Sequence, residues 1–573
     1  MEKIWLKSYS KTTPNEIDLN EFDSIIDLFE QSCDLYSDKT AYINMGVKMT
    51  YKDLNEKSKK FASFLQNELN MKKGDRLAIM MPNLLQYPIA LFGAMRAGII
   101  IVNVNPLYTA RELEHQLNDS GTTAIIILEN FCHVLADCIQ NTAVKHVITT
   151  EIGDMFNFTK RKLVNFVVKK IKKMVPKYAL ESSISFRKAL TIGEFNTFHH
   201  IKLSHRDLAF LQYTGGTTGI SKGASLSHKN MIANMQQAKA WLNFEEGSET
   251  VITALPLYHI FALTANCLVF LRLGGSNILI TNPRDIPLFI KTLKSSSFTA
   301  ITGVNTLFKA LMNHPKFSEI DFSKLKLSLG GGMAVQEAVA SKWKKLTGCT
   351  LLEAYGLTEA SPAVCINPME ITNFTGSIGI PLPSTLVSIR TEKNKVCDVL
   401  KEGEICVKGP QVMSGYWNRP DETKKIFTND GWLKTGDMAT MDEKGFVRIV
   451  SRKKDMILVS GFNVYPNEIE DLLVKLDGVL ECAAIGIKDE KSGERVKLCI
   501  VKSDPKLSEK DVINYCKKNL TDYKQPKAIE FYEELPKTNV GKILHRALRE
   551  PEQKFATKMK ETLNEQIQTK KES

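Results

Sequence analysis

The sequence predicts an α/β fold in which a large N-terminal domain of βαβ subdomains and a small β-rich subdomain precede a small α+β C-terminal domain. Three observations predict it. Short apolar runs alternate with helix-length segments over residues 24–150 and 208–355, strand patterns rich in Gly and Pro follow near residue 380, and a mixed pattern begins after Lys454. A chain of 573 residues also exceeds the usual size of one hydrophobic core, so several domains are expected.

The first part of the chain carries the pattern of a parallel sheet. Residues 51–68 have the apolar spacing of a helix, whereas the runs at 76–81, 98–104, 124–128 and 147–149 are short and rich in β-branched residues. Strands separated by helix-length segments are typical of βαβ units, whose strands pair in parallel.

The later part of the chain changes to other patterns. Alternating apolar and polar residues after residue 380 predict a β-rich subdomain, and the segment after Lys454 mixes helical and strand spacing. The elements predicted there are strands at 386–392, 403–409, 445–451, 481–487 and 497–502 and helices at 467–476 and 509–520.

Composition limits the classes of partner. A net charge of +12 and a pI near 8.9 favour anionic partners such as nucleotides or acidic lipids, although a basic balance also serves solubility. No C2H2 spacing or RNP-like segment is present, so no nucleic-acid partner is expected. The 11 cysteines are scattered without a CxxC pair, which disfavours a metal cluster or disulfide framework and favours a reducing cytosol. The apolar stretches 84–104 and 260–271 are interrupted or too short to span a membrane, and no signal peptide is expected.

The segment from Tyr213 to Gly223, YTGGTTGISKG, is the sharpest local signal for chemistry. Glycines permit close backbone approach, hydroxyls and amides donate hydrogen bonds, and Lys222 adds a positive charge, so the segment predicts a cradle for polyphosphate between a strand and a helix. It is not a P-loop, because that motif requires Gly-Lys followed by Ser or Thr. A plain Gly/Thr-rich turn is the alternative.

This loop resembles the signature of the adenylate-forming superfamily, which contains acyl-CoA synthetases, luciferases and peptide-synthetase adenylation domains. Four further motifs follow in the family's order: YGLTE at 355–359, TGD at 435–437, RKKD at 452–455 and PKTNVGK at 536–542. The segments PLYHIFAL, ITGVNTLF and SGFNVYPNEIE are similar to those of bacterial long-chain fatty acyl-CoA synthetases. The resemblance extends from near the N-terminus to Arg549.

The resemblance implies an ATP-dependent ligase that joins long-chain fatty acids to coenzyme A through an acyl-adenylate and releases AMP and pyrophosphate, in fatty-acid degradation or lipid metabolism. ATP, Mg²⁺ and coenzyme A are the implied cofactors. By the same resemblance, the catalytic residues are Lys542, Thr214, Glu359 and His259, with Glu359 and Thr358 at the metal. The implied nucleotide- and cofactor-binding residues are Tyr213, Thr214, Gly215, Gly216, Thr217, Thr218, Gly219, Ser221, Lys222, Gly223, Gly331, Tyr355, Gly356, Thr358, Asp437, Arg452 and Gly461. The implied acyl-pocket residues are Tyr258, Phe261, Thr302, Gly303 and Val304.

The resemblance also implies that the C-terminal domain rotates between the two half-reactions about a hinge at Lys454. The expected domains are an AMP-binding domain at 1–451, a hinge at 452–456 and a mobile domain with a polar tail at 457–573. Ser451 departs from the family pattern, which has an acidic residue there, and this makes the energetics of the hinge uncertain.

A basic amphipathic segment at 159–177 has eight Lys or Arg and no acidic residue. Its apolar residues share one helical face and are Leu163, Phe166, Val167, Ile171 and Met174. This pattern predicts peripheral contact with an anionic membrane from the cytoplasm, and a solvated helix packed on the domain is the alternative. A homodimer is compatible with the sequence.

Two rival functions follow from the same residues. An amino-acid adenylation domain would need an acidic partner for the substrate ammonium near PLYHIFAL, and none is present. A lipid-binding protein that has lost catalysis is disfavoured by the intact Glu359, Asp437 and Lys542.

Overall fold

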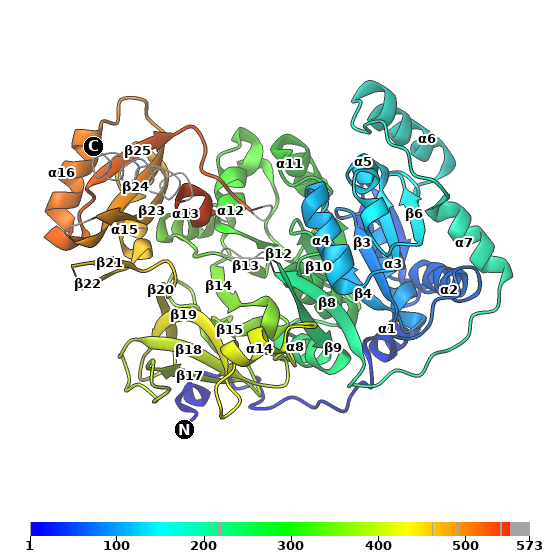
Figure 1. Ribbon diagram of the computed structural model, residues 1–573, viewed down its shortest axis with the longest axis horizontal. Helices are drawn as coiled ribbons and strands as arrows, with labels where there is room; N and C mark the ends of the chain where they lie inside the picture. Colours follow the sequence, from blue (N-terminus) through cyan, green and yellow to red (C-terminus); the bar gives the residue numbers. More distant parts are fainter. Residues whose placement is uncertain are drawn as a thin grey trace, which may run out of the picture.

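The computed structural model describes residues 2–214, 221–460, 462–489, 492–538, 541 and 543–549, and it confirms the predicted α/β class. In Figure 1 two layered parallel sheets form the large domain, an antiparallel sheet lies below, and the C-terminal unit lies beside them. Seven residues with predicted roles lie outside the described residues: Gly215, Gly216, Thr217, Thr218, Gly219, Gly461 and Lys542.

The first sheet has seven strands in the order β7-β6-β5-β3-β4-β8-β9, and only the pair β8–β9 is antiparallel. Its strands are β3 (Arg76–Met80), β4 (Ile100–Asn103), β5 (Ala124–Leu128), β6 (His146–Thr150), β7 (Ser183–Ser185), β8 (Leu208–Thr214) and β9 (Lys222–Ser227). Its connections contain α2 (Tyr51–Asn67), α3 (Gln86–Arg96), α4 (Ala110–Ser120), η2 (Glu129–Phe131), α5 (Cys132–Ala136), η3 (Ile139–Asn141) and α7 (Phe186–Phe195). The four strands and the helix predicted for residues 51–149 are confirmed.

The second sheet has nine strands in the order β16-β15-β14-β13-β12-β10-β11-β1-β2, with antiparallel pairs only towards its two edges. Its strands are β1 (Thr40–Asn44), β2 (Val47–Thr50), β10 (Thr250–Thr253), β11 (Ser276–Leu279), β12 (Ala300–Gly303), β13 (Leu327–Gly330), β14 (Leu351–Gly356), β15 (Ala363–Ile366) and β16 (Ile380–Pro381). Helices on or near it are α9 (Ile260–Ala262), α11 (Ile286–Lys294), α12 (Asn305–Met312), η6 (Pro315–Glu319), α13 (Glu337–Thr347) and η7 (Thr358–Ala360).

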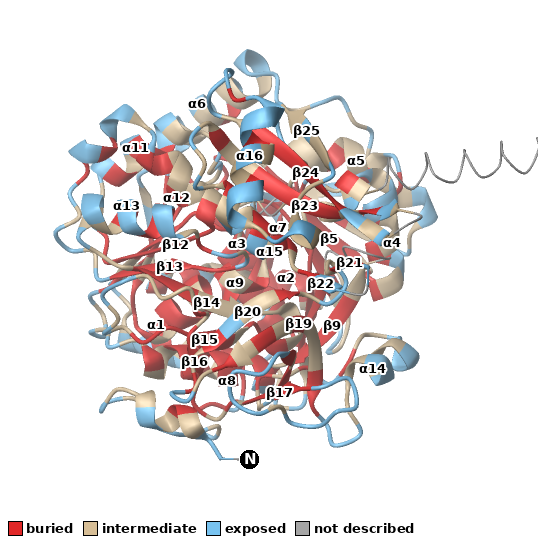
Figure 2. Cartoon of the chain, turned by 90° about the vertical axis from the view of Figure 1, so that its left-hand side faces the viewer, coloured by how far each residue is buried: buried red, intermediate tan, exposed pale blue. Residues whose placement is uncertain are grey.

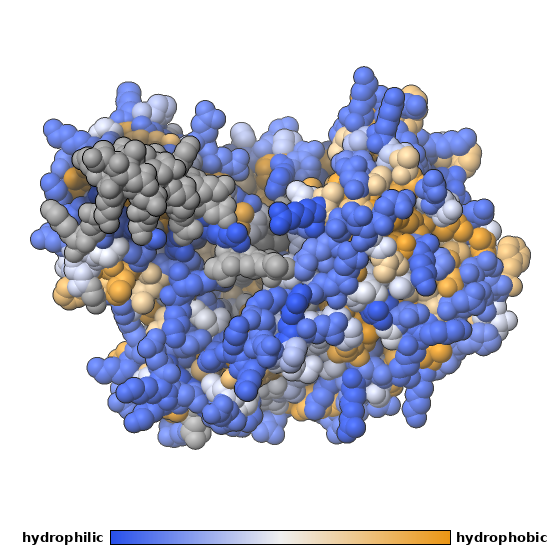
Figure 3. Space-filling model, viewed as in Figure 1, coloured by the Kyte–Doolittle hydropathy of each residue, from blue (hydrophilic) through white to orange (hydrophobic). Residues whose placement is uncertain are grey.

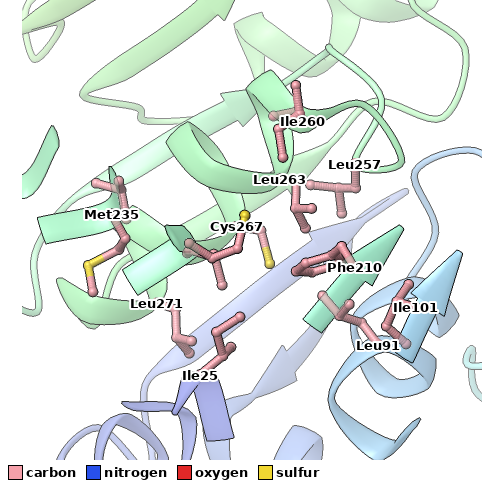
Figure 4. Close-up of a cluster of buried hydrophobic side chains, with 14 of the residues drawn as sticks. Ile25, Leu91, Ile101, Phe210, Met235, Leu257, Ile260, Leu263, Cys267 and Leu271 are labelled. Carbon is pink, nitrogen blue, oxygen red and sulfur yellow. The ribbon is translucent and has the colours of Figure 1, made fainter. Parts of the chain in front are cut away.

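A shared core joins the two parallel sheets. Helix α8 (His228–Trp241) is buried along nearly its whole length, and α1 (Ile25–Leu35), η5 (Leu263–Leu268) and α10 (Val269–Arg272) pack around it. In the close-up of Figure 4, side chains from strands of the first sheet and from these helices converge, among them Phe210, Met235, Leu263 and Cys267. Figure 2 shows the same division, with buried strands inside and exposed outer faces on α11, α13 and α16. The interior apolar area stabilises the large domain as one unit.

The β-rich subdomain and the C-terminal unit follow in chain order, as predicted. The first is the antiparallel sheet β17 (Leu386–Arg390), β18 (Gly403–Lys408), β19 (Leu433–Met441) and β20 (Val447–Arg452), with α14 (Pro420–Ile426) beside it and η1 (Ile4–Ser8) packed against it through Trp5. The second contains β21 (Ile457–Val459), β22 (Phe462–Val464), β23 (Val479–Asp489), β24 (Gly493–Lys502), β25 (Ala528–Tyr532), α15 (Pro466–Leu473), α16 (Glu509–Asn519) and η8 (Asp522–Lys524). Residues 453–456 connect the two sheets, where the sequence predicts the hinge; the boundaries 1–451, 452–456 and 457–573 stay a prediction.

The basic segment is helical, as predicted, over α6 (Phe158–Phe166) and a π-helical turn, η4 (Val167–Ile171). It projects from the edge of the first sheet at the upper right of Figure 1. Within the described part of the chain, none of the helices combines the length and the apolar character needed to cross a bilayer.

A buried carboxyl lies where the large domain meets the C-terminal unit. Glu353 on β14 is buried, and burial raises its pKa to about 8; the positive charge of Arg448 opposes the shift and the negative charge of Asp471 on α15 adds to it. Burial, reinforced by Glu470, raises the pKa of Asp471 to about 6. The protonated form of Glu353 is therefore favoured at neutral pH.

We expect this carboxyl to make stability depend on pH. An unfolded glutamate titrates near pH 4.3, so between about 4.3 and about 8 the folded state holds a proton that the unfolded state has lost. The stabilisation is fully present below the lower value and is lost as the pH rises through the higher one. Replacing Glu353 by Gln should remove this pH-dependent component. The Tm of the variant minus the Tm of the wild type should therefore increase from about pH 5 to about pH 9. A Tm difference that stays constant over this range would contradict the assignment.

Candidate functional site

One cavity of about 1370 Å³ lies where the two parallel sheets, the antiparallel sheet and the C-terminal unit meet. It brings together predicted residues that are far apart in the chain. Those that line it are Tyr213, Thr214, Ser221, Lys222, Tyr258, His259, Phe261, Thr302, Val304, Gly331, Tyr355, Gly356, Thr358, Glu359, Asp437, Arg452 and Lys454. Gly223 and Gly303 lie just outside the lining. A Cβ on Gly223 would stand 3.0 Å from the Tyr213 ring, and the Gly303 carbonyl accepts from the Gly331 N–H at 3.2 Å.

The predicted phosphate loop is framed by a β-hairpin. Tyr213 pairs with Gly223 and Thr214 with Lys222 across β8 and β9, and the Ser221 hydroxyl donates to the Thr214 carbonyl at 2.6 Å. The sequence predicts a strand before the loop and a helix after it, and the structure inserts β9 before α8. The six residues of β9, KGASLS, are small and carry too little apolar alternation to indicate a strand, and pairing with β8 decides the conformation.

Lys222 is already neutralised by an acidic residue that sequence reasoning missed. Its Nζ forms an ion pair with Glu422 and lies 5.3 Å from the centre of the Tyr416 ring. The hydrogen bonds from Lys222 and Lys425 lower the pKa of Glu422 to about 2. The Lys222 side chain is therefore held at the cavity by a carboxylate.

A second charged pair supports the other side of the hairpin. The Tyr213 hydroxyl donates to Asp119 at 2.7 Å, and Asp119 also forms an ion pair with Arg419, which lines the cavity. The segment 415–422 reaches this position because the backbone N–H groups of Ser225 and Trp417 donate to Gly415 and Gly223. The signal that could have found it is the cluster of aromatic and charged residues in GYWNRPDE.

Glu359 and Thr358 lie on the turn η7 at the cavity wall. The Tyr416 hydroxyl donates to the Glu359 carboxylate at 2.6 Å, and the Met413 N–H donates to the Glu359 carbonyl at 2.8 Å, so both ends of this residue are held. The described residues contain no cluster of three His, Cys, Asp or Glu side chains able to hold a metal by themselves. The site thus offers one carboxylate and one hydroxyl to a cation.

Asp437 stands at the junction of the antiparallel sheet and β14. Its carboxylate accepts from the Tyr355 hydroxyl at 2.6 Å and lies 3.3 Å from the Arg452 guanidinium, because Asp437 and Arg452 are register partners on β19 and β20. Burial first, and then the Asp437 charge, raise the pKa of Tyr355 well above its usual value, which keeps its hydroxyl a donor. Each carboxylate oxygen keeps a lone pair with which it can accept from a ligand hydroxyl.

The other end of the cavity is apolar. His259 caps the start of α9, where its Nδ1 accepts from the Phe261 N–H at 3.3 Å, and a Cβ on Gly331 would stand 2.9 Å from the Phe261 ring. Beyond these residues the cavity continues between α8 and the second sheet. The side chains that sequence reasoning missed there are Asn234, Ala238, Leu242, Leu255, Val269, Phe270, Leu327, Leu329, Ile366 and Met369.

The C-terminal unit reaches into the same cavity. Lys537, Thr538 and Leu544 line it, and a Cβ on Gly541 would stand 2.7 Å from the Thr306 hydroxyl. Lys537 is held by Glu481 at 2.8 Å. The described residues on either side of this motif's end, Lys537, Thr538 and Leu544, therefore form part of the cavity wall.

Solved structures share this fold over nearly the whole chain. The anthranilate CoA ligase AuaEII in complex with anthranoyl-AMP superposes with a TM-score of 0.84 at 22% identity and covers 94% of this chain and 100% of its own, which shows the fold. ATP-bound MatB from Rhodopseudomonas palustris superposes with a TM-score of 0.78 at 28% identity and covers 92% of this chain and 98% of its own.

Sequence relatives extend over nearly the whole chain. It is 57% identical over 552 residues to the long-chain-fatty-acid–CoA ligase of Escherichia coli O157:H7, covering 96% of this chain and 98% of the relative. It is 53% identical to that of Haemophilus influenzae (96% and 99%) and 38% identical to that of Bacillus subtilis (96% and 98%). The family of AMP-binding enzymes matches residues 29–417, and its C-terminal domain matches residues 468–542. With both parts matched in order, the chain belongs to the family of AMP-binding enzymes.

Proposed function

We propose that this protein is an ATP-dependent ligase that joins long-chain fatty acids to coenzyme A through an acyl-adenylate, releasing AMP and pyrophosphate, in fatty-acid degradation or lipid metabolism. The observation that carries the proposal is a single cavity with a phosphate hairpin and Asp437 at one end and apolar walls at the other. Relatives with this activity in their names are 38–57% identical over nearly the whole chain.

In the first half-reaction a carboxylate oxygen attacks the α-phosphorus of ATP and pyrophosphate leaves. The main difficulty is charge, because an anion approaches a centre already surrounded by negative oxygens. The residues at the hairpin hold the β- and γ-phosphates once Glu422 releases Lys222. Asp437 accepts hydrogen bonds from the ribose hydroxyls, and the Tyr355 ring packs against the adenine.

Magnesium fits the donor set at Glu359. Mg²⁺ usually takes one or two protein oxygens and completes its shell with phosphate and water, and Glu359 with Thr358 offers such a pair beside the phosphate hairpin. When bound, the ion supplies positive charge that offsets the charge of the leaving pyrophosphate. The Tyr416 hydroxyl orients the Glu359 carboxylate for this role.

In the second half-reaction, the thiol of coenzyme A must reach the acyl-adenylate in the same cavity. In our proposal the C-terminal domain rotates about Lys454 and exposes a different face, including Gly461, to the acyl-adenylate. The thiolate of coenzyme A then attacks the acyl carbonyl, and AMP leaves. His259 lies at the junction of the polar and apolar parts of the cavity, where the acyl carbonyl would sit.

The proposal is tested by ATP–pyrophosphate exchange with palmitate and with amino acids. Palmitate should support exchange, whereas amino acids should not, and adding coenzyme A should yield palmitoyl-CoA and AMP in equal amounts. Exchange driven by an amino acid would indicate an adenylation domain instead. The absence of exchange with every acid, in a protein that binds lipid, would indicate a lipid-binding protein without catalysis.

We also propose that α6 and η4 touch an anionic membrane, with the enzyme in the cytoplasm. Of the predicted apolar face, Leu163, Phe166, Ile171 and Met174 are exposed by 49–64%, and Val167 is half-buried. The opposite face packs on the domain through Val164 and Val168. Figure 3 shows hydrophilic and hydrophobic residues side by side at the upper right, where this segment lies. Exposed apolar side chains with lysines around them are typical of interfacial helices.

The contacts of Lys169 change the design of the membrane test. Its Nζ lies 2.7 Å from Glu129 and also pairs with Glu151, so this lysine anchors the helix to the domain. Lys170, Lys172 and Lys173 are exposed, as are Lys162 and Lys177 towards the two ends of the segment.

Replacing Lys170, Lys172 and Lys173 together by Gln should weaken binding to anionic vesicles about a hundredfold, since each basic residue at such a surface contributes about 1 kcal/mol. Co-sedimentation with vesicles containing phosphatidylserine measures it. The matched control replaces Lys510, Lys517 and Lys518, on or beside α16, by Gln and should bind as the wild type does. If both variants bound the vesicles equally well, the proposal that α6 and η4 form the membrane-binding surface would be rejected.

A further inference from the structure

A second cavity of about 400 Å³ lies on the other side of α8, between its C-terminal end and the N-terminal segment 10–21. Two side chains, Leu242 and Met369, line both this cavity and the large one. Both are half-buried and pack against the main core. The two cavities therefore meet at a wall made by these side chains.

Helix α8 separates the cavities along its length. Asn234, Ala238 and Leu242 are spaced four residues apart and face the large cavity, so this stripe is about 12 Å long. The side chains that face the second cavity are Met235, Gln236, Lys239, Ala240 and Asn243. Leu242 immediately follows the helix, where its backbone turns to an extended conformation and the partition ends.

An aromatic pair continues the wall beside Leu242. Phe270 lines the large cavity and Phe244 lines the second one, and their rings meet edge to face with centres 6.0 Å apart. This pair packs α10 against the chain after α8. Beside this aromatic pair, the wall between the cavities consists of the flexible aliphatic side chains of Leu242 and Met369, which are the part of it that is most easily displaced.

The two sides of the wall differ in chemistry. The polar groups of the large cavity at this end are paired within the protein: the Asn234 amide donates to the Ala363 carbonyl at 2.8 Å and the Thr264 hydroxyl to the Ser361 carbonyl at 2.7 Å. The second cavity carries charged groups instead, among them Arg272, which lies 2.9 Å from Glu21. Burial in the large cavity lowers the free energy of an alkyl chain, and the chain would lose this stabilisation beside the charged groups of the second cavity.

We propose that Leu242 and Met369 form the end wall of the acyl tunnel and so set the longest fatty acid that the enzyme activates. The inference rests on the proposed function, because it assigns the methyl end of the acyl chain to this wall. A chain that fits ends against the two side chains. A longer chain must push them aside and place its methyl end among charged groups and water.

Opening the wall should shift the preference to longer chains. In the variant Leu242→Ala/Met369→Ala, kcat/KM for eicosanoic acid relative to hexadecanoic acid should rise about tenfold, the effect typical of added room in an apolar pocket. The opened variant should also gain activity with ω-hydroxyhexadecanoic acid, whose terminal hydroxyl would reach the polar cavity. Leu242→Phe should act in the opposite direction and lower the ratio of hexadecanoic to decanoic acid about tenfold.

The controls are Leu69→Ala and Met155→Ala, which remove half-buried side chains of the same types that line neither cavity. Thermal midpoints of all variants show whether any change in profile follows loss of stability. Chain-length profiles of the wall variants that match those of the controls would overturn the inference while leaving the proposed function intact. A wild type that activates no acid of the series would overturn the proposed function itself, and the inference with it.

Discussion

Replacing Lys542 by Ala should abolish formation of the acyl-adenylate and spare the transfer of a supplied acyl-adenylate to coenzyme A. The physical reason is that this cation would serve only the first transition state, where negative charge gathers between the carboxylate and the α-phosphate. Loss of a group that stabilises developing charge in this way costs about 10²- to 10³-fold in rate. Lys542 itself lies outside the described residues, but Gly541 before it stands against Thr306 at the cavity.

The two half-reactions are measured separately, by ATP–pyrophosphate exchange and by thioester formation from synthetic palmitoyl-adenylate. The control is Lys506→Ala, which removes an exposed lysine of the same domain. An equal fall of both half-reactions would show that Lys542 has another role, and unchanged exchange would remove it from the chemistry.

Replacing Lys454 by Pro should stop thioester formation while leaving adenylation substantially active. In this structure the turn after β20 is closed by the N–H groups of Asp455 and Met456, which donate to the Arg452 carbonyl, and the Arg549 guanidinium holds Asp455 at 3.0 Å. A hinge residue must change its backbone dihedrals for the domain to rotate, and proline fixes φ near −65° and restricts the residue before it. The variant should therefore retain the arrangement in which Lys537, Thr538 and Leu544 line the cavity.

We expect the overall rate of thioester formation to fall about a hundredfold or more, the cost typical of misplaced reacting groups, and palmitoyl-adenylate to accumulate on the enzyme. Quenched-flow analysis of bound intermediate measures it, with Lys454→Ala as the control that keeps backbone freedom. A parallel loss of both half-reactions together with a lower Tm would indicate general destabilisation and reject the hinge.

The local sequence pattern was sufficient to predict many of the helices and strands. The strands at 124–128 and 481–487 and the helices at 51–68 and 509–520 appear where they were predicted. The two strands are short, largely buried apolar runs, and the two helices bury residues at helical spacing, so both signals lie in neighbouring residues of the chain. The strand β9 was missed for the complementary reason. Its sequence has no such period, and only its pairing with β8 makes it a strand.

The order and spacing of the sequence motifs predicted main residues of the large cavity, including Asp437 and Glu359. Each motif can be recognised from its own consecutive residues, without knowing which other residues pack against it. The partners of those residues could not be predicted. Tyr416 reaches Glu359 across 57 residues of chain and Glu422 reaches Lys222 across 200, and no local signal specifies contacts at such separations.

What the sequence determined by itself is thus the fold class, the family and candidate site residues that the structure brings together in one cavity, because these depend on periodicity and on motifs that are continuous in the chain. The tertiary structure alone decided which face of α6 is exposed, that Lys169 is held by Glu129 and Glu151, and that Leu242 and Met369 line both cavities. These properties depend on the direction in which each side chain points after the sheets and helices have packed. That direction is settled by the burial of apolar area over the whole domain, to which segments hundreds of residues apart contribute together.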